Sequence, residues 1–152
     1  MELYTIDVKP FKQTFLQNFI LLVVATLGSF LLINNGYFIL NNFDPQRQYT
    51  LPIMIAMIAV AFVYTFYRKK QLEKVFNYND FYEQVEEYRK VYRLTMRWYV
   101  LSCMVSCFLA VLTARNIFLF FAGYDLIMLA PYYPTTFLFK RELRNPEIIL
   151  HS

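Results

Sequence analysis

One acidic residue, Asp125, stands inside an otherwise apolar run, FFAGYDLIMLAPYYP at residues 120–134. A carboxyl group in such a setting can exchange a proton or bind a cation, or it can link helices by accepting hydrogen bonds. The hydroxyl groups of Ser102, Ser106 and Tyr124 are the candidates to share those bonds. Both serines are expected at a matching depth in the preceding apolar run. These four residues form the predicted polar site.

Motifs of known enzyme classes are missing from the sequence. It contains no G-x-S-x-G, no phosphate-binding glycine loop and no dinucleotide fingerprint. The single histidine, His151, lies in the tail, and no base is close to Ser102 or Ser106 in sequence. Cys103 and Cys107 are four residues apart in an apolar block, where we expect them to pack as small hydrophobic residues. We therefore expect a chain that is not an enzyme, with no catalytic residue, metal or cofactor.

Composition indicates that these residues belong to a membrane protein. Hydrophobic residues make up 58% of the chain and charged residues 17%, against roughly 45–50% and about 25% in soluble domains. Charge-free blocks occupy residues 15–33, 50–67 and 98–114, and a fourth block, 117–139, contains Asp125 as its only charge. About 20 apolar residues suffice to cross the hydrocarbon core as a helix.

The predicted fold class is all-α, an integral membrane four-helix bundle in a single domain covering residues 1–152. The transmembrane helices are predicted at about 14–36, 50–67, 98–114 and 117–139. No proline or glycine interrupts 81–114, so the third helix is expected to continue the cytoplasmic segment 68–97 without a break. That segment is predicted to form a helical hairpin between the second and third helices. Pro131 and Pro134 predict a kink or a helix end near Ala130.

The predicted hairpin has one apolar face. Its residues are four, three and four positions apart, which places them on one side of a helix: Phe81, Val85, Tyr88 and Tyr92. We expect this face to pack against the extension of the second helix, around Leu72 and Phe76, or against a partner.

The distribution of basic residues predicts the topology. The amino-terminal segment carries Lys9 and Lys12, the middle loop carries eight Lys and Arg residues and the tail carries three, whereas the other side carries only Arg47 and Arg115. Because cytoplasmic loops collect Lys and Arg, both termini and the middle loop are expected to be cytoplasmic. This bias explains the net charge of +4 without nucleic acid.

Four basic residues approach the membrane along the predicted hairpin and are candidates to hold anionic lipid headgroups: Arg89, Lys90, Arg93 and Arg97. The simpler interpretation is a solvated face that follows the positive-inside rule. Neighbouring glutamates dilute the charge and argue against nucleic acid as a partner.

The last third of the chain carries a resemblance. From Thr113 onward, TARNIFLFFAGYDLIMLAPYYPTTFLFKREL resembles the final span and tail of small four-span bacterial membrane proteins of uncharacterised function. In these a short polar turn with Asn opens the span, and Pro-Thr followed by a basic residue and an acidic-Leu pair closes it. The resemblance implies a bacterial cytoplasmic (inner) membrane and no particular activity.

These observations predict a non-enzymatic accessory, assembly or interaction subunit of a membrane complex. Its partners would be the lipid bilayer and other membrane protein subunits or further copies of the chain. The alternative is a small oligomeric transporter or channel that uses Asp125. Transporters typically bring several polar groups together and often contain a repeat, and here one acid is present without a clear repeat.

Overall fold

The computed structural model describes residues 4–37, 39–40, 44, 46, 48–78 and 80–151. The chain is mostly helical, as predicted for an all-α fold. Its elements, in order, are β1 (Tyr4–Asp7), α1 (Lys9–Asn34), α2 (Thr50–Val75), α3 (Phe81–Thr113), α4 (Asn116–Leu129), the 3₁₀ turn η1 (Ala130–Tyr132), α5 (Thr136–Leu143) and β2 (Ile148–His151).

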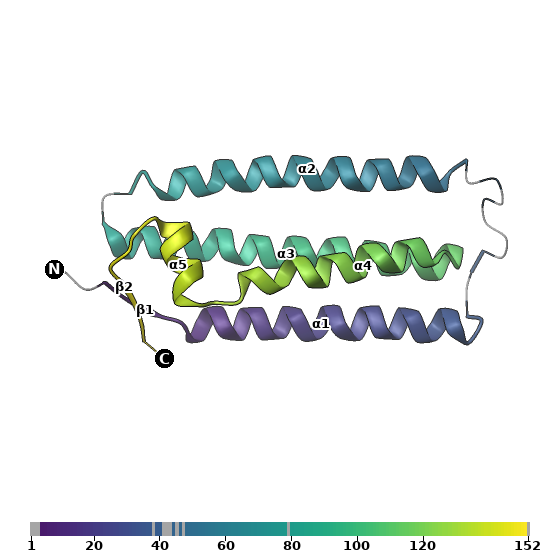
Figure 1. The fold of residues 1–152 in the computed structure, drawn as a ribbon, viewed down its shortest axis with the longest axis horizontal. Coiled ribbons are helices and arrows are strands. Elements are labelled where there is room, and N and C mark those ends of the chain that lie inside the picture. The colour runs from purple at the N-terminus through teal and green to yellow at the C-terminus, as the bar shows by residue number, and fades with distance from the viewer. Residues whose placement is uncertain are drawn as a thin grey trace.

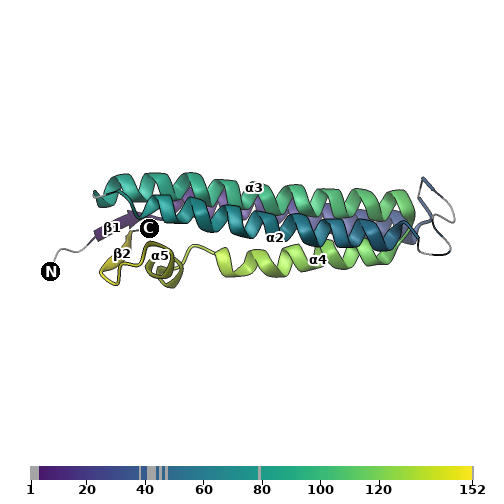
Figure 2. The ribbon, with the colours of Figure 1, turned by 90° about the horizontal axis from the view of Figure 1, so that it is seen from above.

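Four long helices lie side by side along the longest axis of the molecule (Figures 1 and 2). Helices α1, α3 and α4 pack against one another, while α2 packs on α3. Both termini lie near the turn between α2 and α3, and the C-terminal end of α1 and the N-terminal end of α2 lie at the opposite end (Figure 1).

The lengths and hydropathies of these helices fit a membrane. Helices α1, α2 and α3 are each long and apolar enough to cross one, and the bent pair Asn116–Tyr132 and Thr136–Leu143 brings the number to as many as four among the described residues. Helix α3 is uninterrupted over 33 residues, about 50 Å at 1.5 Å per residue. The predicted unbroken helix is therefore confirmed over residues 81–113, and α2 likewise runs past residue 67 to Val75.

The last predicted span, 117–139, is not one straight helix. Helix α4 ends at Leu129, η1 follows, and α5 begins at Thr136 after a bend of 86°. Pro131 and Pro134 lack the amide hydrogens that a continuing helix needs, so the chain turns near Ala130, where the sequence predicted a break. The hydroxyl of Thr135 then caps α5 by accepting a hydrogen bond from the Leu138 amide at 3.2 Å.

A two-stranded parallel sheet adds to the helical prediction. Tyr4 is opposite Ile148 and Asp7 is opposite His151, so the first and last described segments are paired. The Val8 amide continues this pairing by donating to the His151 carbonyl at 3.1 Å. No strand was predicted in either segment from the sequence.

The apolar face predicted for the hairpin packs elsewhere than expected. The ring of Tyr88 lies 6.0 Å from Phe11 of α1 and 5.8 Å from Phe139 of α5, and the ring of Tyr92 lies 5.2 Å from Phe11. Phe81 contacts Tyr4 of β1 at 4.4 Å. The bend after α4 explains this difference, because it folds α5 and the sheet onto α3.

The end of α2 around Leu72 and Phe76, where this face was expected to pack, contacts the core and the C-terminal segment. Leu72 is partly buried against the core and Val75 is fully buried, and Val85 of α3 also lies at the edge of the core. The ring of Phe76 is covered by the Arg144 guanidinium, whose central carbon lies 4.4 Å from the ring centroid. Residues of the C-terminal segment therefore cover the side of the hairpin that was predicted to pack against α2 or a partner.

Candidate functional site

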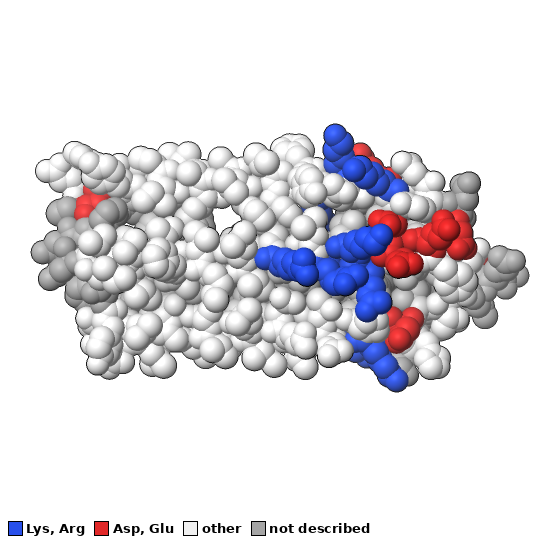
Figure 3. Space-filling view, turned by 180° about the vertical axis from the view of Figure 1, so that it is seen from behind, with Lys and Arg blue, Asp and Glu red and all other residues white. Residues whose placement is uncertain are grey.

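A cleft of about 600 Å³ lies between α2, α3, α4 and η1. Figure 3 shows an opening at this level, between α2 and the rest of the molecule. The volume is within the roughly 300–1,000 Å³ of ordinary ligand sites. Asp125, Ser102 and Tyr124, three of the four residues of the predicted polar site, line this cleft.

Asp125 lies on the packed face of α4. That face carries Phe118, Ala122 and Leu129 at spacings of four, three and four with Asp125, and all four side chains are buried. The side chain of Ser102 on α3 is a hydrogen-bonding neighbour of the Asp125 carboxyl group. The second carboxyl oxygen, Oδ2, is buried and has no hydrogen-bond partner among the described residues. Asp125 is only 8% exposed.

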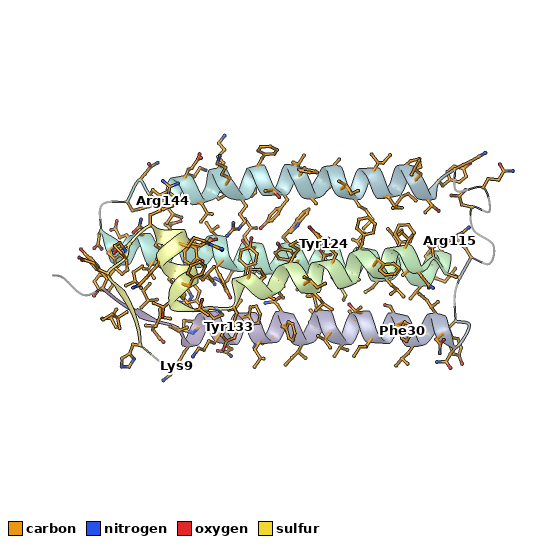
Figure 4. The ribbon with its side chains drawn as sticks, viewed as in Figure 1. Lys9, Phe30, Arg115, Tyr124, Tyr133 and Arg144 are labelled. Carbon is orange, nitrogen blue, oxygen red and sulfur yellow. The ribbon has the colours of Figure 1, made fainter. Side chains whose placement is uncertain are left out.

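The other two members of the predicted site behave differently. Ser106 is buried, but its hydroxyl donates to the Ser102 carbonyl one turn earlier at 2.9 Å, a common local bond for serine in a helix. Tyr124 is about half-exposed and lies on the side of α4 that lines the cleft (Figure 4). The structure therefore brings Asp125 together with Ser102 and Tyr124, and leaves Ser106 in the helix packing.

Arg68 occupies one end of the cleft and was not predicted as a site residue. Its Nη2 lies 2.5 Å from Oε2 of Glu142, and its Nε donates to the Thr95 hydroxyl at 3.1 Å. Its guanidinium carbon also lies 4.8 Å from the centroid of the Tyr132 ring. The charge of Arg68 is therefore compensated inside the protein. The single acid within the basic run KRELR, residues 140–144, is the sequence signal for this pair.

Aromatic rings form much of the cleft wall. Tyr64 of α2 and Trp98 of α3 stack with their centroids 4.2 Å apart and an interplanar angle of 5°. Tyr99 lies 5.7 Å from Tyr132, and Phe120, Phe121 and Tyr124 line the α4 side. The cleft is thus apolar and aromatic around one carboxyl group and one paired arginine.

The predicted lipid-binding residues line a second groove. Lys90, Arg93 and Arg97 face a groove of about 390 Å³ between α2 and α3, and Arg89 is exposed on the same helix. Glu87 lines this groove too and pairs with Lys90. On the face shown in Figure 3, Lys and Arg side chains gather toward the end that holds the α2–α3 turn, followed by a long stretch without charge.

The cysteines belong to the packing between α1 and α3. Cys103 and Cys107 are buried and free, with their Sγ atoms 4.0 Å apart. The Thr26 hydroxyl of α1 lies 3.5 Å from the Cys103 sulfur. Within the described part of the chain, no group of three His, Cys, Asp or Glu side chains is arranged to hold a metal ion.

Comparison of the chain with protein-family models, curated proteins and solved structures gives no match. What the cleft can bind must therefore be inferred from its own side chains. They provide an apolar volume, stacked aromatic rings, a buried carboxyl oxygen that can accept a hydrogen bond or face a positive charge, and an arginine already engaged by Glu142.

Proposed function

We propose that this chain is a non-enzymatic accessory or interaction subunit of a membrane complex and that α2 is its contact helix. The observation that supports this proposal is the low burial of α2. Only Thr50 and Val75, at its two ends, are buried. By comparison, α3 buries residues throughout its length, against α1, α4 and the C-terminal segment.

Helices in lipid associate through close packing and interhelical hydrogen bonds, since the hydrophobic effect does not drive them together. Helix α2 makes few such contacts within the chain, and its outer side presents large apolar residues such as Val63 and Phe66. A transmembrane helix of another protein is the partner that fits this long, uncharged side. The leading function is therefore assembly with a larger membrane protein.

The proposed topology has four membrane crossings with both termini in the bacterial cytoplasm. Lys9 and Arg144 lie at one end of the molecule and Arg115 lies at the other (Figure 4). The end with Lys9 and Arg144 also holds the α2–α3 turn (Figure 1), so the Lys-rich and Arg-rich segments share one side, which the positive-inside rule makes cytoplasmic. The segment of α3 with Lys90, Arg93 and Arg97 would then face the anionic headgroups of the inner leaflet.

A small oligomeric transporter or channel is the second candidate function. It is supported by Asp125, which lines the cleft and whose buried Oδ2 atom has no hydrogen-bond partner among the described residues. Intramembrane acids are costly and commonly mark ion or proton pathways. In this alternative, further copies of the chain would surround the pathway.

Photo-crosslinking in native membranes tests the contact helix. A photoreactive residue at Val63 or Phe66 of α2, which are 68% and 71% exposed, should yield an adduct with a distinct membrane protein. The same probe at Leu27 of α1, which is 58% exposed, is the matched control. Adducts with lipid alone at all three positions would reject the assembly proposal, and adducts only between copies of this chain would favour the transporter.

A further inference from the structure

We propose that the cleft between α2, α3 and α4 binds a lipophilic organic cation, with the Asp125 carboxylate as its counter-charge and the surrounding aromatic rings as its walls. This ligand site goes beyond the proposed assembly function. It lies on the inner side of α2, whereas the proposed partner contacts the outer side, so either can hold without the other.

The buried carboxyl group is the first reason for a cation. Asp125 is buried, with an exposed fraction of only 8%. Its Oδ2 atom has no hydrogen-bond partner among the described residues. A buried polar atom is normally satisfied, so an oxygen without a partner, on a residue that lines a cleft, indicates a missing donor or positive charge. An anionic ligand would instead place like charges together.

Because Arg68 is already paired, Asp125 has no counter-ion among the described residues that line the cleft. The Arg68 guanidinium is held by Glu142 and Thr95, at 2.5 Å and 3.1 Å, and lies over the Tyr132 ring. Of the charged side chains that line the cleft, Arg68 is therefore compensated and Asp125 is not. A positive ligand beside Asp125 would complete the charge balance of the cleft.

The composition of the walls determines the class of cation. A small hard ion such as Ca²⁺ or Mg²⁺ needs about six or more oxygen ligands, whereas the described lining places Asp125 beside Ser102 and otherwise mainly apolar and aromatic groups. Aromatic rings attract delocalised or quaternary cations, and Trp does so most strongly. Tyr64, Trp98 and Tyr124 bring such rings to the cleft, and Tyr64 and Trp98 stack on each other.

The surroundings of the cleft fit a ligand that arrives from the bilayer. Phe62 on α2 and Phe120 on α4 line the cleft and are 63% and 74% exposed. In residues 50–67 of α2 and 116–129 of α4, the only charged side chain is that of Asp125. A hydrophilic cation would have to cross lipid to reach this position, whereas a lipophilic cation partitions into it.

Trp98 provides a direct test, because it is the only tryptophan in the chain and it lines the cleft. The purified full chain in lipid nanodiscs is titrated with tetraphenylphosphonium, and with tetraphenylborate as an anion of matched shape. Trp98 fluorescence and equilibrium dialysis are measured in parallel, so that binding without a fluorescence change is also detected. We expect saturable binding of the phosphonium and no saturable binding of the borate.

Three variants assign the effect to Asp125. Asp125→Asn keeps the size but removes the charge, and it should weaken phosphonium binding at least tenfold, about 1.4 kcal/mol, with unchanged circular dichroism and elution volume. Asp125→Glu should retain most of the affinity. Glu83→Gln, which removes an exposed acid at the start of α3, should match the wild type. Equal binding of both ions, non-saturable partitioning only, or an unchanged affinity in a folded Asp125→Asn variant would each overturn the proposal.

Discussion

Arg68 and Glu142, which are 74 residues apart in the sequence, form an ion pair that joins α2 to α5. Their side chains are only 16% and 6% exposed, and Arg68 also contacts Thr95 of α3 and the ring of Tyr132 in η1. Four elements therefore meet at one guanidinium group. Because α2 makes few other contacts, this pair is a principal tie between α2 and the C-terminal segment.

Glu142→Gln should destabilise the protein by about 3 kcal/mol, since removing one partner of a buried pair leaves the other charge uncompensated. The free energy of unfolding can be measured by steric trapping in bicelles. Glu83→Gln removes an exposed acid and should change stability by less than about 0.5 kcal/mol. The double variant Arg68→Met with Glu142→Leu should recover most of the loss. A Glu142→Gln variant as stable as the control would show that the pair contributes nothing.

Local patterns predicted the helices of this fold well. The lack of proline and glycine after Phe81 indicated a single long α3, and Pro131 and Pro134 indicated the break near Ala130, both as found. The first helix was predicted to end near residue 36, and α1 ends at Asn34. The φ angle of Gly36 is +78°, and the amides of Gly36 and Tyr37 donate to carbonyls of the last helical turn.

Contacts between segments that are distant in the sequence could not be predicted from such local patterns. The β1–β2 sheet joins segments more than 140 residues apart, and the Arg68–Glu142 pair depends on the 86° bend that brings α5 back. The cleft exists only because α2 stands apart from α4, which no pattern within a single helix encodes. The sequence therefore indicated Asp125, Ser102, Ser106 and Tyr124 as a group, of which Ser106 does not line the cleft. It did not indicate the aromatic wall on α2.

Replacing Ala114 by glycine should stabilise the turn between α3 and α4. Ala114 is the C-cap of α3 and has a φ angle of +52°, in the left-handed region. In this conformation a residue with a Cβ atom is less stable than glycine by about 1 kcal/mol. In thermal denaturation in detergent, the Ala114→Gly variant should melt at a higher temperature than the wild type. Its free energy of unfolding should be larger by about 0.5–1 kcal/mol. The control Ala110→Gly, at a buried position inside α3, should be destabilised.

Asp44 should make stability depend on pH in the acidic range. Burial acts to raise the pKa of its carboxyl group, but hydrogen bonds from Thr50, Tyr49 and Gln48 outweigh burial and lower the pKa below its usual 3.8. The backbone amides of these three residues donate at 2.6, 2.8 and 2.6 Å. The pKa of Asp44 is therefore lower in the folded than in the unfolded protein. The stability that the ionised carboxylate contributes is complete above pH 3.8 and is lost as the pH falls through the folded-state pKa.

The matched variant for this test is Asp44→Asn, which cannot titrate. The difference in melting temperature between the wild type and Asp44→Asn should be constant from pH 7 to about pH 5 and should shrink as the pH approaches 3. A difference that does not change over the whole range would contradict the role of the ionised carboxylate at the start of α2.

Lipid retention should depend on the groove residues of α3. Replacing Lys90, Arg93 and Arg97 together by glutamine should reduce the number of anionic lipids that stay bound in native mass spectrometry, because each basic residue near anionic headgroups contributes about 1 kcal/mol. The control replaces Lys69, Lys70 and Lys74 of α2, which changes the net charge equally but leaves the groove intact. Equal losses in both variants would indicate a general charge effect without a lipid site.

The sign of the stability change in Asp125→Leu separates the two interpretations of this residue. If Asp125 mainly links helices, the leucine variant should lose about 1 kcal/mol, the scale of one intramembrane hydrogen bond. The buried Oδ2 atom without a partner among the described residues favours the opposite result. An intramembrane carboxylate costs at least about 2.5 kcal/mol, so leucine should stabilise the empty protein by about 1–2 kcal/mol while removing cation binding. Steric trapping of Asp125→Leu beside Asp125→Asn gives the sign. A destabilised leucine variant with a stable asparagine variant would show that hydrogen bonding, rather than charge, is the role of this side chain.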